Sequence, residues 1–244
     1  MILILGSTHD DVLYFDSIMT NKHSEMILDK YPITIGTIFN QEVILVYDIY
    51  TSYISGIITS YIIQKYYVIL TFVVGKCVSF SNDVKVGDIA VSKRIILGDV
   101  NQIKEANVKL GQIPKFPRSL ETDEEVISYV VNAIEKRSFA HYFHASFISS
   151  NSIYDDESKL KEIEMNGLVL GHNKNVVFDC TSGGAALACS LFKIPFIAVK
   201  VVQYLINDKS SAENYMDVLK QYSCVGKAVV TCIGDIGRND VVRE

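Results

Sequence analysis

The stretch from residue 174 to residue 208 constrains the fold most, because it reads as strand, turn, helix and strand in close succession. An apolar run leads into Phe178 to Cys180 and stops at a polar, glycine-bearing turn at 181–184. A small-residue helix is expected at 185–192, and a second apolar strand opens at Ile194. Both strands should deliver polar side chains to one edge of a sheet, beside a helix N-terminus. Ligands of open α/β sheets bind at such an edge, so we expect a pocket there.

Apolar runs alternate with helical patterns along the rest of the chain. We expect strands at 2–5, 67–74, 89–97 and 142–149, a hairpin at 31–39 and 42–49, and helices at 8–18, 53–61, 121–136, 155–163 and from 212 to about 233. This alternation, with right-handed crossovers, predicts a three-layer α/β/α sandwich, and the hairpin makes its central sheet mixed. No repeat or boundary divides the chain, so residues 1–244 are expected to form a single domain.

The composition limits the partners of the chain. Hydrophobic residues make up 49% of it, and a net charge of −5 without a basic stripe argues against nucleic acid. The five cysteines form no CxxC pair and lie mostly in apolar runs, as reduced thiols of a cytoplasmic protein do. His141 and His144 would face opposite sides of a strand, so we expect no metal and no cofactor.

The most apolar stretch, residues 53–75, is long enough to suggest a membrane span. Gln64 and Lys65 divide it, however, into a helical half and a β-branched, aromatic half that suits a buried strand. Met1 leads directly into an apolar strand, with neither a basic segment nor a cleavage site. We therefore expect no membrane segment and a cytoplasmic location.

Four segments carry a family resemblance: VKVGDIAVS at 84–92, GQIPKFP at 111–117, ISSNSI at 148–153 and FDCTSGGAALACSLFKIPFIAVK at 178–200. Together they resemble the nucleoside phosphorylase and nucleosidase family, most closely the methylthioadenosine/S-adenosylhomocysteine nucleosidases. The fourth segment aligns without gaps with the family's VDMEGAA helix and the strand after it. Residues 199–219 look most like the plant-type branch. The resemblance spans nearly the whole chain and implies a phosphorylase/hydrolase-like fold that takes a nucleoside-like ligand.

The resemblance also implies roles for particular residues. Asp11 matches the carboxylate that activates water as general base, although its side chain is one methylene shorter. Thr181 replaces the glutamate that holds the ribose hydroxyls, and Tyr204 replaces the aspartate that protonates the leaving purine. Asp208 becomes the acid instead if the loop is registered four residues differently. The other implied substrate-binding residues are Lys76, Asn151, Ile153, Cys180 and Lys200.

These replacements weaken the family's chemistry. A phenol with a pKa near 10 is a poor proton donor at neutral pH. A threonine hydroxyl cannot hold two ribose hydroxyls as a carboxylate does, and it gives no negative charge to a cationic transition state. Two hypotheses follow: a nucleosidase or phosphorylase with low turnover, or a degenerate homologue that binds a nucleoside- or nucleotide-like ligand as a sensor or partner protein.

The charge of the pocket and the assembly state are two further expectations. Lys76 and Lys200 would make the pocket basic and suited to phosphate or another anion, unless they turn to solvent or pair with Asp10, Asp11 or Asp179. The tyrosine-rich helix at 50–61 carries more apolar surface than a monomer normally exposes, and the resemblance implies pairing through this region. We therefore expect a homodimer. The pocket should bring together Gly6-Ser7, Gly75-Lys76, Asn151, Cys180-Thr181 and Tyr204.

Overall fold

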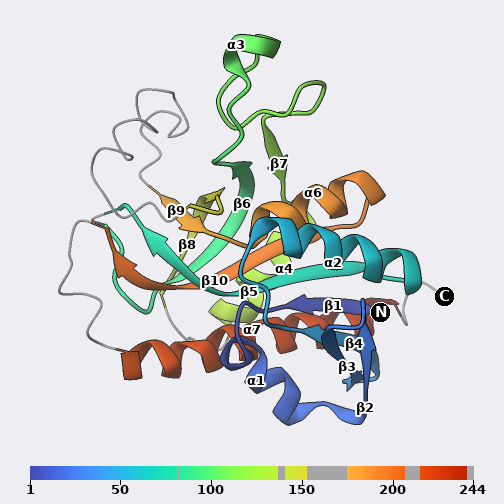
Figure 1. The fold of residues 1–244 in the computed structure, drawn as a ribbon. Coiled ribbons are helices and arrows are strands. Elements are labelled where there is room, and N and C mark those ends of the chain that lie inside the picture. The colour runs from blue at the N-terminus through green and yellow to red at the C-terminus, as the bar shows by residue number, and fades with distance from the viewer. Residues whose placement is uncertain (82, 137–140, 153–174, 207–214, 241–244) are drawn as a thin grey trace.

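The computed structural model describes residues 1–81, 83–136, 141–152, 175–206 and 215–240, and its strands form a single mixed sheet (Figure 1). The strands are β1 (Ile2–Leu5), β2 (Thr20–Ile27), β3 (Tyr31–Ile38), β4 (Gln41–Val46), β5 (Leu70–Ser79), β6 (Ile89–Leu97), β7 (Ser119–Glu121), β8 (Tyr142–Ser149), β9 (Val176–Asp179) and β10 (Phe196–Leu205). Their order in the sheet is β10-β6-β8-β9-β5-β1-β4-β3-β2, and β7 pairs with β6. Parallel pairs such as β1–β5 stand beside antiparallel pairs such as β5–β9.

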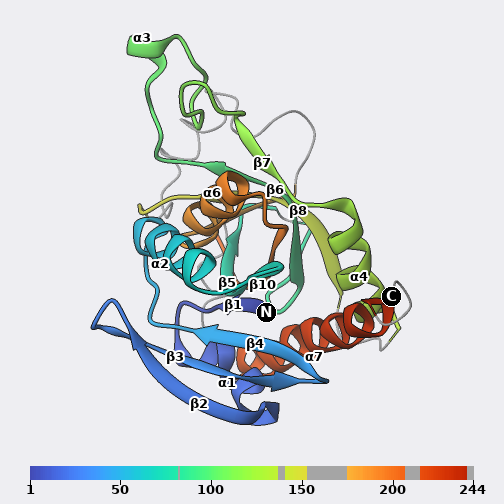
Figure 2. The same cartoon turned by 90° about the vertical axis from the view of Figure 1, so that its right-hand side faces the viewer.

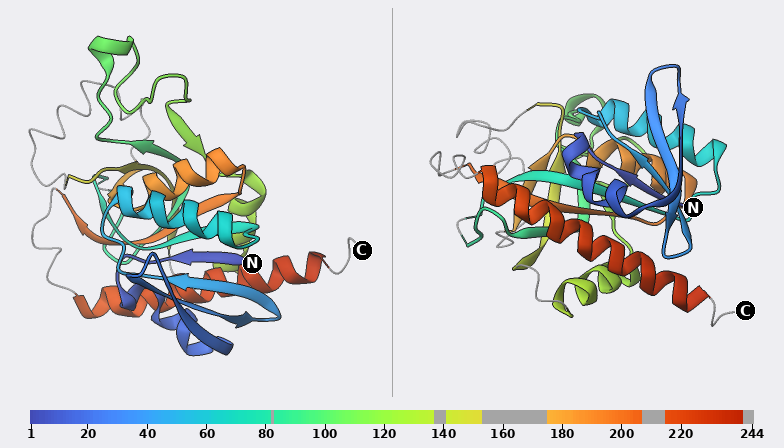
Figure 3. Two further views of the ribbon diagram at one scale, coloured as in Figure 1. Left: turned by 45° about the vertical axis from the view of Figure 1, so that its right-hand side comes forward. Right: turned by 90° about the horizontal axis from the view of Figure 1, so that it is seen from below.

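Helices cover both faces of this sheet (Figure 2). They are α1 (His9–Ile18), α2 (Ser52–Lys65), α3 (Ile103–Ala106), α4 (Glu124–Glu135), α6 (Ser182–Phe192) and α7 (Tyr215–Asp240). α1, α4 and α7 pack on one face and share one apolar cluster, whereas α2 and α6 share another cluster on the opposite face. Seen from below, α7 runs across the sheet beside α1 and α4 (Figure 3). The prediction of a three-layer α/β/α sandwich with a mixed sheet is confirmed.

One part of the sheet closes on itself. β10 pairs in parallel with β5 and antiparallel with β6, so β5, β9, β8, β6 and β10 form a ring. Both faces of β5 are buried from Leu70 to Gly75, which is why its sequence is a continuous apolar run without alternation. The ring brings the second half of β5, the end of β9 and the second half of β10 together at one place.

Several local predictions differ from the structure. The turn expected at 181–184 is already helical from Ser182 onward, so α6 begins three residues earlier than predicted. β2 was not predicted, and Glu121 belongs to β7 rather than to the following helix. Lys200 lies in the middle of β10. The helix expected at 155–163 lies outside the described residues. No described helix is long and apolar enough to cross a membrane.

Candidate functional site

A cavity of about 400 Å³ opens where the ring meets the β1–α1 turn. Its size lies within the range of small-molecule sites. Its walls combine hydroxyl, thiol, aromatic and charged groups, so it can hold a ligand with both apolar and polar parts. The lining residues are Ser7, Thr8, Tyr50, Lys76, Cys77, Val78, Ser152, Phe178, Asp179, Cys180, Lys200, Gln203 and Tyr204.

Asp11 is buried in the first turn of α1, next to this cavity. The backbone N–H of Thr8 donates to Oδ2 of Asp11 at 2.8 Å, which fixes the carboxylate at the helix start. Oδ1 is buried without a hydrogen-bond partner among the described residues. Gly75 allows this close approach: its φ is +130°, and a Cβ there would lie 3.0 Å from Oδ2 of Asp11. The sequence thus places a carboxylate directly against Gly75 of β5.

The surroundings of Asp11 favour proton uptake. Burial raises the pKa of the Asp11 carboxyl above its usual range, although the Thr8 N–H and the charges of Lys200 and Lys76 act in the opposite direction. A carboxylate with a raised pKa is a better proton acceptor for a water molecule than an ordinary surface aspartate. Asp11 therefore has the chemistry of a general base, and the two lysines lie close enough to modulate it.

A buried polar network, formed by Asp179, Thr181, Ser182 and Lys200, lies at the start of α6. Lys200 is 1% exposed, and its Nζ lies 2.6 Å from Oδ2 of Asp179 and donates to Oγ1 of Thr181 at 2.8 Å. The same Oδ2 accepts from the backbone N–H of Ser182 at 3.0 Å and from the Ser182 hydroxyl. Oδ1 of Asp179 is buried and has no partner among the described residues.

This network fixes the charge of its members. Burial opposes ionisation of Asp179, but the charge of Lys200 and hydrogen bonds from Lys200, Ser182 and Ser149 outweigh it, so the Asp179 pKa lies below its ordinary value. Lys200 thus pairs with Asp179, which is one of the arrangements that the sequence left open. A neutralised pair of this kind adds little net charge to the cavity.

Lys76 differs from Lys200. It lines the cavity and is half-buried, and within the described part of the chain its side chain makes no hydrogen bond or ion pair. Its charge acts at a distance and helps to lower the pKa of Asp11. Lys76 therefore supplies a positive charge to the cavity wall that no ion pair among the described residues neutralises.

The remaining predicted residues divide between the cavity and other places. Cys180 and Tyr204 line the cavity; burial, followed by the charge of Asp179, raises the pKa of the Cys180 thiol, so it faces a ligand as a neutral group. Thr181 is not among the lining residues, but its Oγ1 accepts a hydrogen bond from Lys200, which does line the cavity. Ile153 and Asp208 lie outside the described residues.

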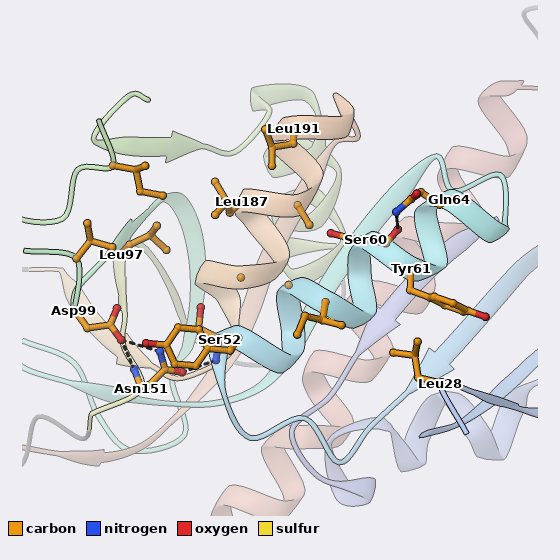
Figure 4. A pocket seen from close by; sticks show the side chains of 17 residues that line it. Leu28, Ser52, Ser60, Tyr61, Gln64, Leu97, Asp99, Asn151, Leu187 and Leu191 are labelled. Carbon is orange, nitrogen blue, oxygen red and sulfur yellow. Dashed lines mark hydrogen bonds between the residues drawn. The ribbon is translucent and has the colours of Figure 1, made fainter. Parts of the chain in front are cut away.

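Asn151 lies at a second cavity. Its Oδ1 accepts from the N–H of Ser52 at 2.8 Å, and its amide nitrogen donates to Asp99 at 2.7 Å, so it caps α2 (Figure 4). The neighbouring residue, Ser152, lines the 400 Å³ cavity instead. The second cavity measures about 630 Å³ and lies between α2, α6 and the segment after β6. Apolar side chains such as Leu187 and Leu191 dominate its view in Figure 4.

Three residues that line the cavity are not predicted as pocket residues by the sequence. Asp179 is predicted there only as a possible partner of a lysine, and Tyr50 and Phe178 carry no prediction for the pocket. The available signal was their position: Phe178 and Asp179 end a strand directly before the glycine turn. Tyr50 lies between β4 and α2, where local sequence gives no such signal.

The fold and the site define an α/β protein with a polar cavity of small-molecule size at strand ends. The chain belongs to the Phosphorylase superfamily, whose family model matches residues 4–233. It is similar to the 5'-methylthioadenosine/S-adenosylhomocysteine nucleosidase of Staphylococcus epidermidis, with 22% identity over 89% of this chain and 92% of the relative. The predicted nucleoside phosphorylase/nucleosidase membership is confirmed, whereas the plant-type branch stays a prediction.

Solved structures share this fold. The 5'-methylthioadenosine/S-adenosylhomocysteine nucleosidase of Neisseria meningitidis, in complex with methylthio-immucillin-A, superimposes with a TM-score of 0.85 at 14% identity, covering 96% of this chain and 98% of that one. The futalosine hydrolase of Helicobacter pylori reaches a TM-score of 0.82 at 16% identity, covering 96% and 97%. The fold thus hosts hydrolases of more than one named substrate.

Proposed function

We propose that this chain binds a purine nucleoside such as methylthioadenosine in the 400 Å³ cavity and hydrolyses its N-glycosidic bond slowly, in the cytoplasm. The observation that carries the proposal is the buried carboxylate of Asp11, with its raised pKa, beside a polar cavity of ligand size. Named relatives that act on such nucleosides support the choice of ligand.

In the proposed reaction Asp11 takes a proton from a water molecule. The water oxygen bonds to C1′ of the sugar while the C1′–N bond breaks, and the bonding electron pair leaves with the base. The base then needs a proton. Tyr204 lines the cavity, but a phenol is a weak acid at neutral pH, and the charge of Asp179 is neutralised by Lys200. Asp208 stays the alternative proton donor. Turnover is therefore slow for two reasons. The proton donor is weak, and no unpaired negative charge of Asp179 stabilises a cationic transition state.

Release of free base from methylthioadenosine, adenosine, inosine and uridine, with and without phosphate, tests the proposal. Weak release from methylthioadenosine is expected. The double variant Thr181→Glu/Tyr204→Asp should raise it by about two orders of magnitude or more, because each restored group supplies transition-state stabilisation. Rapid release by the unaltered protein, lost in Asp208→Asn, would move the acid to Asp208 and contradict the assignment of Tyr204.

The second candidate function is binding of an anionic ligand without turnover, as a sensor. Lys76 favours it, because this cation lines the cavity without an ion pair among the described residues. Thermal stabilisation by phosphate or a nucleotide but not by the neutral nucleoside, abolished in Lys76→Ala, would support this function. Equal stabilisation by methylthioadenosine in the presence or absence of the Lys76 side chain would leave the nucleoside site described above.

We also propose that the chain forms a homodimer through the second cavity. Tyr53 and Ile57 of α2 and Leu191 of α6 are 69%, 55% and 59% exposed, and all three line that cavity. Large apolar side chains clustered in this way are typical of protein–protein interfaces.

A further inference from the structure

Two buried polar groups at the start of α1 have no hydrogen-bond partner among the described residues. They are the hydroxyl of Thr8 and Oδ1 of Asp11. The proposed reaction assigns a role to Asp11 but none to Thr8. A buried donor or acceptor that stays unpaired costs free energy, and such groups in native proteins are nearly always paired with protein, water or a ligand. The two groups therefore indicate an occupant that hydrogen-bonds to both of them.

The first turn of α1 holds these two groups next to each other. The N–H of Thr8 donates to Oδ2 of Asp11 at 2.8 Å, and the N–H of Asp11 donates to the carbonyl oxygen of Thr8 at 3.2 Å. Burial raises the pKa of the Asp11 carboxyl, and the Thr8 hydroxyl is close enough to oppose this rise. Thr8 lines the 400 Å³ cavity, so the two groups meet at its wall.

The chemistry of the two groups selects the atom that can bridge them. A carboxylate oxygen only accepts hydrogen bonds, whereas a threonine hydroxyl can donate its proton. An oxygen atom that carries a proton satisfies both, because it can accept from Thr8 and donate to Asp11. A water molecule meets this requirement, since a buried water makes about two to four hydrogen bonds. Held in this way, the water points one of its protons at the base, as general-base catalysis requires.

We infer that the hydroxyl of Thr8 positions the water molecule that Asp11 deprotonates. The role given to Thr8 rests on the proposed function, in which Asp11 is the base. One lone pair of the water oxygen accepts the Thr8 proton in a hydrogen bond, and one water proton passes to Oδ1 of Asp11. The second lone pair forms the bond to C1′. Thr8 neither gains nor loses a proton, so it is a positioning residue that fixes the direction of attack.

Substitution of Thr8 tests this role. Thr8→Val removes the hydroxyl but keeps the backbone N–H that holds Oδ2 of Asp11. Release of base from methylthioadenosine is measured above the pH at which the rate stops rising, where Asp11 is ionised in every variant. We expect kcat to fall by about 10- to 100-fold, because the water loses its orientation. The Kd from calorimetric titration should change by less than about threefold, because the lost contact is made to the water and not to the nucleoside.

Three further variants separate the hydroxyl from the shape of the side chain. Thr8→Ser keeps the hydroxyl and should recover most of kcat. Thr8→Ala lacks the hydroxyl, should show the same loss as Thr8→Val, and replaces that variant if it does not fold. Thr20→Val is the matched control: Thr20 is exposed and does not line the cavity, so the same change there should leave kcat and Kd unaltered.

Each other outcome contradicts the role of Thr8. An unchanged kcat in the folded variants without the hydroxyl would overturn it. A Kd raised more than about tenfold at constant kcat would overturn it too, because the hydroxyl would then bind the nucleoside itself. An equal loss of kcat in Thr8→Ser would show that the shape of the side chain matters and not its hydroxyl. Absence of base release by the unaltered protein would refute the proposed function and this role together, and it is seen before any variant is made.

Discussion

Asp11 illustrates how one side chain serves the helix and the cavity at the same time. Its Oδ2 holds the Thr8 N–H, while burial raises the pKa of the carboxyl. Asn can keep the first contact through its amide oxygen but cannot accept a proton from water. We expect Asp11→Asn to fold normally and to lose about 10²- to 10⁴-fold in base release. Unchanged turnover in a folded Asp11→Asn protein would rule out this residue as the base.

If Asp11 is the base of the proposed reaction, its pKa should set the pH dependence of base release. Only ionised Asp11 acts as a base, so the rate should rise with pH as the pH passes through its raised pKa. Lys76→Ala removes a charge that lowers this pKa, so the rise should move to higher pH. Lys85 is exposed and is not among the residues that line the cavity, so Lys85→Ala is the matched control and should leave the profile in place. A profile unaffected by loss of Lys76 would mean that another group titrates.

Asp179 stabilises the folded protein through its ion pair with Lys200. The pKa of Asp179 is lower in the folded protein than in the unfolded chain. Its contribution to the free energy of unfolding is therefore fully present at a pH above the pKa of the unfolded chain, and it is lost as the pH falls through the pKa of the folded protein. Asp179→Asn leaves the Lys200 charge buried without its counter-ion, and we expect a loss of about 3–5 kcal/mol in denaturant unfolding. The double variant Asp179→Asn/Lys200→Met removes both charges and should recover part of that loss. A double variant no more stable than the single one would contradict this account.

At the scale of elements, the contact between α2 and α6 depends on glycine. A Cβ at Gly184 would lie 1.7 Å from the Ser52 carbonyl oxygen and 2.7 Å from the Gly56 nitrogen, so the helices would have to separate. A Cβ at Gly56 meets Gly184 at 3.3 Å, a distance that a small shift relieves. We expect Gly184→Ala to cost about 3 kcal/mol or more, measured by thermal or urea unfolding. Gly56→Ala should change stability little, since the gain in helix propensity offsets the tight contact. Equal effects would refute the close-approach argument.

Elements with strong local signals were predictable, and those that depend on distant contacts were not. β5 and β10 appeared as apolar runs, but their pairing, which closes the ring, joins segments more than a hundred residues apart. The sequence does not predict β2, because it is an exposed edge strand with polar side chains on both faces and so lacks the alternation of apolar and polar residues. The start of α6 was misplaced because Ser182 to Gly184 resemble a turn. In the structure Asp179 binds the first N–H of α6, and α2 requires glycine there.

In the site, too, the residues at strand ends were predictable and the contacts between distant segments were not. Strand ends indicated Lys76, Cys180 and Tyr204 as residues of one pocket, and all three line the 400 Å³ cavity. The pairing of Lys200 with Asp179 depends on how β9 and β10 lie relative to each other across the ring, so the sequence left it open. Asn151 caps a helix that lies 99 residues away in the sequence, a contact that no local pattern encodes.

For the whole molecule, the surface around the second cavity is where the proposed homodimer would pair. The proposed homodimer would cover Ile57 and Leu191, whose exposure costs free energy in a monomer. Ile57→Asp places a charge on that surface and leaves the buried residues of α2 untouched, so the fold should persist while pairing is lost. Light scattering at micromolar concentration should therefore give twice the mass of one chain for the unaltered protein and a single mass for Ile57→Asp.

Tyr67 provides the control for this experiment. It is 85% exposed, follows α2 and does not line the second cavity, so Tyr67→Asp makes an equal change of charge outside the proposed interface. This variant should keep the mass of the unaltered protein. A monomeric unaltered chain would overturn the proposed dimer. If the chain pairs but loses pairing in Tyr67→Asp and not in Ile57→Asp, the interface lies elsewhere, because a buried charge disrupts association only where it is desolvated.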